Sequence, residues 1–283
     1  MKKKLIVFSG ILLAVLLVGV CIKVFSGILL AVLLVGVCIK EIKKPQKIVA
    51  DSNTEVIEGT NISFESFGID NFTCTGLTWD SYDSAFWIGD YGALTNTETP
   101  DPRLVEVDKA LKNVIQTIDL SSILSTADNL QGVAFDNSNN SLWLAIGKTV
   151  KNIDKTGTVL SEFDLGKYSK YMANGICVDS EDGTLWVLCY SRYLLHYDKF
   201  GNLIKKMNVN FRDQDHIVVN ADQIWVTAGA DYNGDENYVL TMDKNSGDIS
   251  VKYKVIGAYA VEGICIVGSN MYIANDGLYL YCK

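Results

Sequence analysis

The dipeptide Asp-Lys returns four times along this chain at nearly constant spacing. The copies are Asp108-Lys109, Asp154-Lys155, Asp198-Lys199 and Asp243-Lys244, and successive copies lie 46, 44 and 45 residues apart. A fixed period of this length is typical of a solenoid, a propeller or an array of repeated units. We therefore expect one structural unit of about 45 residues to recur along the chain.

Each repeat carries strand and turn signals upstream of its Asp-Lys pair. A segment of the form x-Gly-apolar precedes a polar turn and an aromatic-centred strand, as in QGVAFDNSNNSLWLA from Gln131 and NGICVDSEDGTLWVL from Asn174. The aromatic centres are Trp87, Trp143, Trp186, Trp225 and Tyr272. A third strand ends at the Asp-Lys pair, and a fourth follows a tight turn. Four antiparallel strands per repeat indicate one blade of a β-propeller.

The pattern predicts an all-β propeller of five four-stranded blades. The fifth repeat begins at Glu262, and the chain ends at Lys283 after only three strands. Its outer strand is expected to come from Asn61–Phe67, because closing the ring with an N-terminal strand removes an open sheet edge. A sixth, degenerate blade within 45–70 and an open stack of sheets are the alternatives.

The N-terminus predicts a membrane anchor. Three lysines from Lys2 precede the block VFSGILLAVLLVGVCIK, which occurs twice in tandem, from Val7 and from Val24. With Leu5 and Ile6, the first copy is long enough for one transmembrane helix. Neither copy is followed by an A-x-A-like cleavage site, which favours an uncleaved signal anchor. We expect an anchor over 1–44, a tether over 45–60 and the propeller over 61–283.

Charge separates these parts. Residues 1–47 hold eight of the 25 basic residues and one of the 33 acidic ones, which leaves 17 − 32 = −15 beyond them. This balance argues against nucleic acid as a partner of the propeller. The expected partners are the membrane, through the N-terminal helix, and a small molecule or a protein ligand. The propeller is expected to lie outside the cytoplasm.

The residues that precede the motif glycine, or His216 in the fourth repeat, are the candidate site. In a propeller the inner strands surround the axis, so these residues should meet at one end of it. They are Thr75, Gln131, Asn174, Asp215 and Glu262. Gln131, Asn174, Asp215 and Glu262 offer the oxygen ligands that Ca²⁺ or another divalent cation prefers. The alternative is a polar channel filled only by water.

Further candidates lie near the same end of the axis. Thr75 of the ring is expected to contact a ligand, and so are Asp90, Arg192 and Asp276, because the loops between the second and third strands open there. Asp215 and His216 are the candidates for catalysis, with His216 as a base. The cysteines show no zinc-binding spacing, and their odd number in the propeller argues against a disulfide framework.

Two propeller families resemble these repeats. EGICIVGSNMYIANDGLYLY from Glu262 resembles the closing repeat of the SdiA-regulated family. NGICVDSEDGTLWV and EGICIV are similar to the NHL-like senescence-marker-protein/gluconolactonase/luciferin-regenerating family. The second resemblance implies a divalent metal, used for lactone hydrolysis, that is held by Asn174, Glu262 and Gln131. Asp215 corresponds by register alone, because His216 stands where that family has glycine.

Three functions remain open from the sequence. The first is a membrane-anchored, extracytoplasmic propeller that binds a small ligand or divalent cation at the axial mouth. The second is a metal-dependent hydrolase of the lactonase or esterase type. The third is a non-catalytic scaffold for protein interaction.

Overall fold

The chain divides into two units, Met1–Lys43 and Lys44–Lys283. The structure, a computed structural model, describes residues 47–69, 72–91, 102–124, 129–168, 170–190, 192–209, 211, 214–229, 236–275 and 279–283. All of them belong to the second unit. The expected anchor and transmembrane helix over 1–44 lie outside the described residues. Within these residues, no helix has the length and apolar character needed to cross a bilayer.

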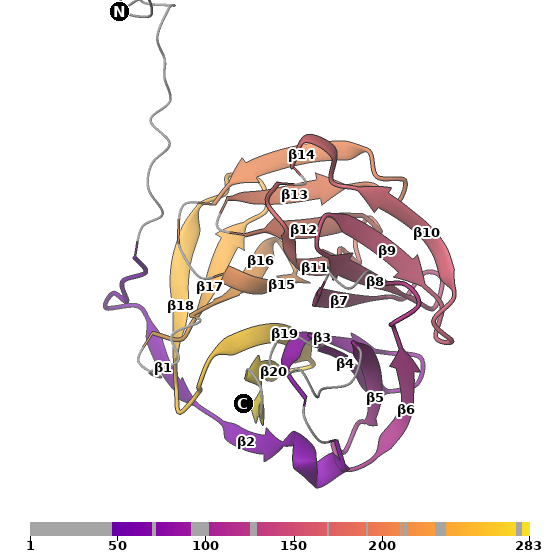
Figure 1. Cartoon of the computed structure of the whole chain (residues 1–283). Helices are drawn as coiled ribbons and strands as arrows, with labels where there is room; N and C mark the ends of the chain where they lie inside the picture. The colour runs from indigo at the N-terminus through magenta and orange to yellow at the C-terminus, as the bar shows by residue number, and fades with distance from the viewer. Residues whose placement is uncertain are drawn as a thin grey trace, which may run out of the picture. The chain divides into compact units, whose positions relative to one another are not determined.

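The second unit is built from five sheets, which we number in chain order (Figure 1). Sheet 1 comprises β3 (Cys74–Asp80), β4 (Ala85–Asp90), β5 (Arg103–Asp108) and β6 (Val114–Asp119). Sheet 2 comprises β7 (Leu130–Asp136), β8 (Ser141–Ile146), β9 (Thr149–Ile153) and β10 (Val159–Asp164). Sheet 3 comprises β11 (Ala173–Val178), β12 (Leu185–Cys189), β13 (Tyr193–Tyr197) and β14 (Leu203–Asn208).

The last two sheets also take strands from the N-terminal side of the unit. Sheet 4 comprises β15 (Gln214–Asn220), β16 (Gln223–Ala228), β17 (Tyr238–Asp243), β18 (Ile249–Ile256) and β1 (Glu55–Glu58). Sheet 5 comprises β19 (Val261–Val267), β20 (Asn270–Asn275), β21 (Tyr279–Cys282) and β2 (Thr60–Ser63). Two short 3-10 helices, η1 (Phe64–Phe67) and η2 (Gly166–Tyr168), lie between strands.

The first strand of each repeat is the innermost strand of its sheet. Contacts link β3 to β7, β7 to β11, β11 to β15, β15 to β19 and β19 back to β3. These contacts close a ring, so the sheets form a propeller around a common axis (Figure 1). Five apolar clusters fill the spaces between neighbouring sheets; Trp87 packs with Leu142 between sheets 1 and 2, for example.

The expectation of five four-stranded blades holds for four of the sheets. Sheet 4 has a fifth strand, because β1 pairs with β18 in parallel and sets Ile57 opposite Val255. The side chain of Ile57 is 2% exposed and packs with Val239 and Val255. The prediction of a tether over 45–60 was therefore wrong for β1, which is a strand of the propeller.

The N-terminal segment also supplies the outer strand of sheet 5. β2 pairs antiparallel with β21, and Ile62 lies opposite Leu280. The strand ends at Ser63, whereas Asn61–Phe67 was expected to be extended throughout. Phe64 and Phe67 form η1 instead, and both rings are buried in the cluster between sheets 5 and 1.

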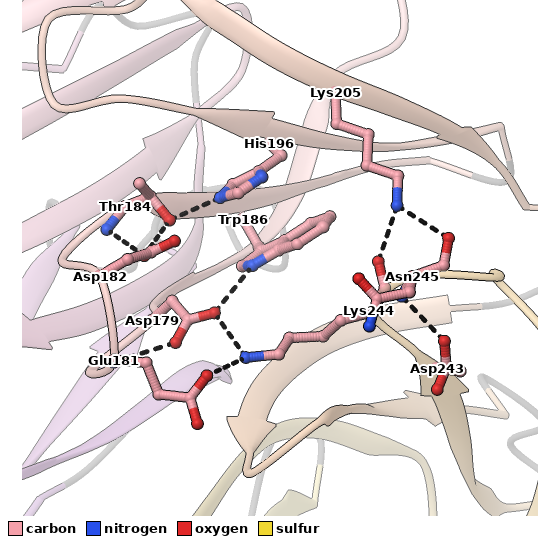
Figure 2. Close-up of polar contacts among 10 residues, drawn as sticks. All are labelled: Asp179, Glu181, Asp182, Thr184, Trp186, His196, Lys205, Asp243, Lys244 and Asn245. Atoms are coloured by element: carbon pink, nitrogen blue, oxygen red, sulfur yellow. Dashed lines mark hydrogen bonds and ion pairs between the residues drawn. The ribbon is translucent and has the colours of Figure 1, made fainter.

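The lysines of three of the four repeated Asp-Lys pairs connect neighbouring sheets. Lys155 of sheet 2 pairs with Asp80 of sheet 1 at 2.5 Å, and Lys199 of sheet 3 pairs with Asp136 of sheet 2 at 2.5 Å. Each of these carboxylates also accepts a hydrogen bond from a tryptophan of its own sheet. The indole N–H of Trp87 donates to Asp80 Oδ2 at 3.2 Å, and that of Trp143 donates to Asp136 Oδ2 at 3.1 Å. We call this Trp–Asp–Lys arrangement the latch. Its third copy, at sheets 3 and 4, is formed by Trp186, Asp179 and Lys244 (Figure 2).

Candidate axial site

The five candidate residues occupy the same structural position in their sheets. In each sheet, the register between the first and second strands shifts at or beside the residue before the motif glycine. In sheet 3, Ala173 lies opposite Cys189 and Gly175 lies opposite Leu188, so Asn174 is an extra residue. Such β-bulges re-aim side chains and are common beside functional sites. We call Thr75, Gln131, Asn174, Asp215 and Glu262 the axial ring.

The motif glycines explain how these strands come so close. A Cβ atom on Gly175 would lie 2.8 Å from the carbonyl oxygen of Asp215, and one on Gly76 would lie 2.7 Å from the nitrogen of Val133. On Gly263 it would lie 2.6 Å from the nitrogen of Leu77. The glycines therefore allow backbone-to-backbone packing between neighbouring inner strands. The x-Gly signal in the sequence marks this close approach.

Two ring side chains bond to the next sheet around the axis. Thr75 Oγ1 donates to the carbonyl oxygen of Leu130 at 2.9 Å. Asn174 Nδ2 donates to the carbonyl oxygen of Gln214 at 3.1 Å and lies 3.4 Å from Oδ1 of Asp215. The structure thus brings Asn174 and Asp215 together as expected from their register.

Exposure differs around the ring. Thr75, Asn174 and Glu262 are buried, at 4%, 8% and 9% exposed, whereas Gln131 and Asp215 are half-buried. The carbonyl oxygen of Glu262 accepts a hydrogen bond from Thr227 Oγ1 at 2.5 Å, which fixes its backbone. The ring holds two carboxylates, two amides and a hydroxyl but no basic side chain. This set is suited to a positively charged ligand.

His216 occupies the place that glycine takes in the other four sheets. Its side chain is 1% exposed, and its Nδ1 accepts a long hydrogen bond, 3.5 Å, from the N–H of Ile264 in sheet 5. Burial lowers the pKa of His216 to about 4, and the backbone of Val133 partly opposes this shift. The imidazole is therefore neutral, with its proton assigned to Nε2. It packs among the inner strands rather than facing solvent.

The other ligand-binding candidates have different surroundings. Asp90 is 3% exposed; it accepts from the N–H of Thr73 at 3.1 Å and pairs with Arg103 at 3.0 Å. It is therefore a buried ion-pair partner and not an exposed rim residue. Arg192 is half-buried, with its guanidinium 5.9 Å from the centre of the Tyr171 ring. Asp276 lies outside the described residues.

One acidic cluster was missed by the sequence reasoning. Among the described residues, Asp80, Asp83 and Glu106 of sheet 1 form the group of three acids whose potential ligand atoms all lie within 4.8 Å of one another. They lie at the end of the inner strand opposite the axial ring, because Asp80 ends β3 and Thr75 is near its start. Glu106 is 23 positions from Asp83, the nearer of the other two, so only the pairing of β4 with β5 brings them together.

Comparisons with known proteins bear on the fold alone. No protein-family model and no curated protein matches the chain. The glutaminyl cyclase of Myxococcus xanthus is 11% identical, with a TM-score of 0.54 over 81% of this chain and 98% of its own. A protein of unknown function from Bacteroides caccae is 10% identical, with a TM-score of 0.50 over 73% and 72%. Sequence identities of 10–11% do not indicate a shared activity. The comparisons show that this chain has the β-propeller fold.

Proposed function

We propose that this protein is a membrane-anchored, extracytoplasmic β-propeller that binds a small cationic ligand at the axial ring. The ligand is a divalent metal ion or an organic ammonium group, since both are recognised by carboxylate and amide oxygens. Asp215 and Glu262 would supply the charge, and Gln131, Asn174 and Thr75 would supply neutral oxygens. The role is binding, without turnover.

The five bulges are the observation that carries this proposal. Each bulge falls at or beside the ring position, and the five ring residues come from five stretches of sequence. A bulge interrupts strand pairing and so has a cost, which a packing role alone does not require at every sheet. The ring side chains also favour a cation over an anion, because all five residues carry oxygen atoms and none is basic. Hard cations are bound by such oxygen sets.

The burial of His216 favours binding over hydrolysis. A general base must come within hydrogen-bonding distance of the proton that it removes. The His216 ring is 1% exposed, and its Nδ1 already accepts from Ile264. The likeness of the motifs at Asn174 and Glu262 to the gluconolactonase-type propellers supports cation binding at the ring. It does not by itself supply a base.

The proposed location rests on the sequence of the N-terminal 44 residues. Their basic start and apolar tandem block are typical of a signal anchor. Treating intact cells with proteinase K tests this location. Degradation of the propeller in intact cells supports it, and protection until the cells are opened contradicts it.

Calorimetric titration tests the binding function. The purified full chain, carrying Glu106→Gln to isolate the ring from the acidic cluster of sheet 1, is titrated with Ca²⁺ and separately with 1,4-diaminobutane. We expect binding of one of them, with affinity reduced at least about tenfold by Glu262→Gln or Asp215→Asn. The control Glu65→Gln removes an exposed charge from η1 and should change nothing. No binding of either probe by folded protein contradicts the proposal.

A further inference from the structure

Sheets 2 and 3 share a hydrogen-bonded arrangement beside the latch. In sheet 2, Ser141 Oγ donates to Oδ1 of Asn139 at 2.7 Å and accepts from Nδ2 of Asn152 at 2.7 Å. In sheet 3, Thr184 Oγ1 donates to Oδ1 of Asp182 at 2.5 Å and lies 2.5 Å from Nε2 of His196 (Figure 2). In both sheets, one hydroxyl joins a turn residue to a residue of the third strand.

Strand register places Glu106 in the same position in sheet 1. Asn152 lies opposite Trp143, His196 lies opposite Trp186, and Glu106 lies opposite Trp87. Likewise, the residue that begins the second strand lies opposite the aspartate of the latch. This residue is Ser141, opposite Asp136, in sheet 2 and Ala85, opposite Asp80, in sheet 1. Sheet 1 therefore has an alanine in place of the bridging hydroxyl. It has carboxylates, Asp83 and Glu106, at the two positions that the hydroxyl joins in sheet 2.

The Glu106 carboxylate is only half satisfied. Its Oε2 accepts from Nε2 of Gln116 at 2.7 Å, whereas Oε1 is buried without a hydrogen bond. The residue is 1% exposed. A buried carboxylate oxygen without a partner is costly, so native proteins seldom retain one without a ligand, a water molecule or a proton to satisfy it.

The surrounding charge is not balanced. Lys155 lies 2.5 Å from Asp80 Oδ2 and 2.6 Å from Asp83 Oδ2, so one ammonium faces three carboxylates. The sum is −3 + 1 = −2, which a divalent cation would neutralise. Asp83 is exposed, while Asp80 and Glu106 are buried, so an ion could enter from the Asp83 side.

We propose that Asp80, Asp83 and Glu106 form a second cation site, which binds one Ca²⁺-like ion at the latch between sheets 1 and 2. Carboxylate oxygens are the preferred ligands of hard cations, and water would complete the coordination shell. Lys155 keeps part of its contact with Asp80, so the ion joins the latch instead of replacing it. The site is separate from the axial ring, at the other end of the inner strands.

A proton is the competing way to satisfy Glu106. Burial raises the pKa of Glu106, and Asp83 and Asp80 add to this effect while Gln116 and Lys155 oppose it. A protonated Glu106 could donate to a neighbouring carboxylate and make the ion unnecessary. The two arrangements differ in their response to a metal ion at neutral pH.

Terbium luminescence tests the proposal on the full chain. Tb³⁺ replaces Ca²⁺ in oxygen sites, and a nearby indole sensitises its emission. The indole N–H of Trp87 donates to Asp80 Oδ2 at 3.2 Å, so this indole lies beside the ion. Excitation of tryptophan should give saturable Tb³⁺ emission that Ca²⁺ displaces. Glu106→Gln should lower the affinity at least about tenfold.

Three variants make the test specific. Glu262→Gln in the axial ring and Asp182→Asn in the corresponding turn of sheet 3 should leave the Trp87-sensitised emission unchanged. The triple variant Asp83→Asn, Ala85→Ser and Glu106→Asn installs the residues of sheet 2; it should fold and bind no ion between sheets 1 and 2. Emission that persists in Glu106→Gln with the affinity of the wild type overturns the site. So does its absence from folded wild-type protein at neutral pH, which would assign a proton to Glu106.

Discussion

The ammonium of Lys244 lies 3.0 Å from a carboxylate oxygen of Asp179, on the neighbouring sheet (Figure 2). The same oxygen accepts the indole N–H of Trp186, and Lys244 also contacts Glu181 at 2.8 Å. The lysine of the Asp-Lys repeat therefore links neighbouring sheets at three of its four copies, and the spacing of these copies in the sequence is the spacing of the sheets. Its buried partner is the Asp at the end of the inner strand and not the Asp of the dipeptide.

Loss of one latch lysine should destabilise the propeller strongly. Asp179 is 3% exposed at its side chain, so Lys244→Met would leave a buried carboxylate without its cation. We expect the free energy of unfolding to fall by about 3 kcal/mol, measured by urea denaturation followed through tryptophan fluorescence. The matched control is Lys109→Met. Lys109 is exposed and the equivalent position of sheet 5 is Val267, so a change of less than about 0.5 kcal/mol is expected. Equal losses in both variants contradict the latch.

Stability should decrease on acidification because of His216. Its pKa is about 4 in the folded state and 6.5 in the unfolded state. Between these values the unfolded chain binds more protons, so the contribution is fully present above pH 6.5 and is lost as the pH falls toward 4. The loss is about 3 kcal/mol. His216→Gly should flatten this dependence of the unfolding free energy.

His196 is the control, since the chain has two histidines. Burial lowers its pKa as well, but the ring is half-buried, stacks on Trp186 and receives opposing influence from Asp182. His196→Gln should flatten the pH profile less than His216→Gly. A steeper effect at His196 would show that the axial imidazole is not the main titrating group.

The inner strands should not accept a side chain at the motif glycines. Gly175→Ala would place Cβ 2.8 Å from two backbone atoms of sheet 4, and backbone atoms can move little in a closed ring. We expect a loss of about 3 kcal/mol in unfolding free energy, by chemical denaturation. Gly257→Ala is the control that separates the steric clash from backbone strain. Gly257 has φ +78°, but a Cβ atom there would have nothing within 4 Å. That control should lose only about 1 kcal/mol.

The strand β1 should contribute to the stability of sheet 4. Ile57→Ala removes a side chain that is 2% exposed, and the expected loss is about 3 kcal/mol in urea denaturation. Val56→Ala, at a neighbouring residue that is 59% exposed, should change the unfolding free energy by less than about 0.5 kcal/mol. If both variants change the unfolding free energy by similarly small amounts, residues 55–58 act as a tether and β1 does not stabilise sheet 4.

The repeat made the fold predictable, because strand-turn-strand patterns and aromatic centres recur with one period. The register of the axial ring was also predictable, since each residue precedes a glycine or His216. The bulges could not be predicted, because a shift in register depends on the residues of both paired strands, whereas the sequence pattern was interpreted one strand at a time. β1 was missed because EVIE is short, and only Ile57 of its residues is buried. Asn61–Phe67 was read as one strand because its alternation does not distinguish η1 from an extended segment.

The latch and the acidic cluster depended on contacts between distant residues. Asp80 and Lys155 are 75 positions apart, and no local pattern pairs them. Asp90 was assigned to the rim from its loop, but Arg103 across the β4–β5 connection holds it in a buried ion pair. Conversely, Asn174 and Asp215 meet because their sheets are neighbours in the ring, which the order of the repeats implies.

Anomalous diffraction from crystals of the full chain grown with Tb³⁺ tests the central claim most directly, because it locates each bound ion. If the ring binds a metal ion, a peak will lie within coordination distance of the carboxylates of Asp215 and Glu262, separate from any peak at Asp80. If the ligand is an organic ammonium, crystals with 1,4-diaminobutane will show it at the same carboxylates. A ring that holds neither probe, with its side chains bonded only to one another, contradicts the proposed function.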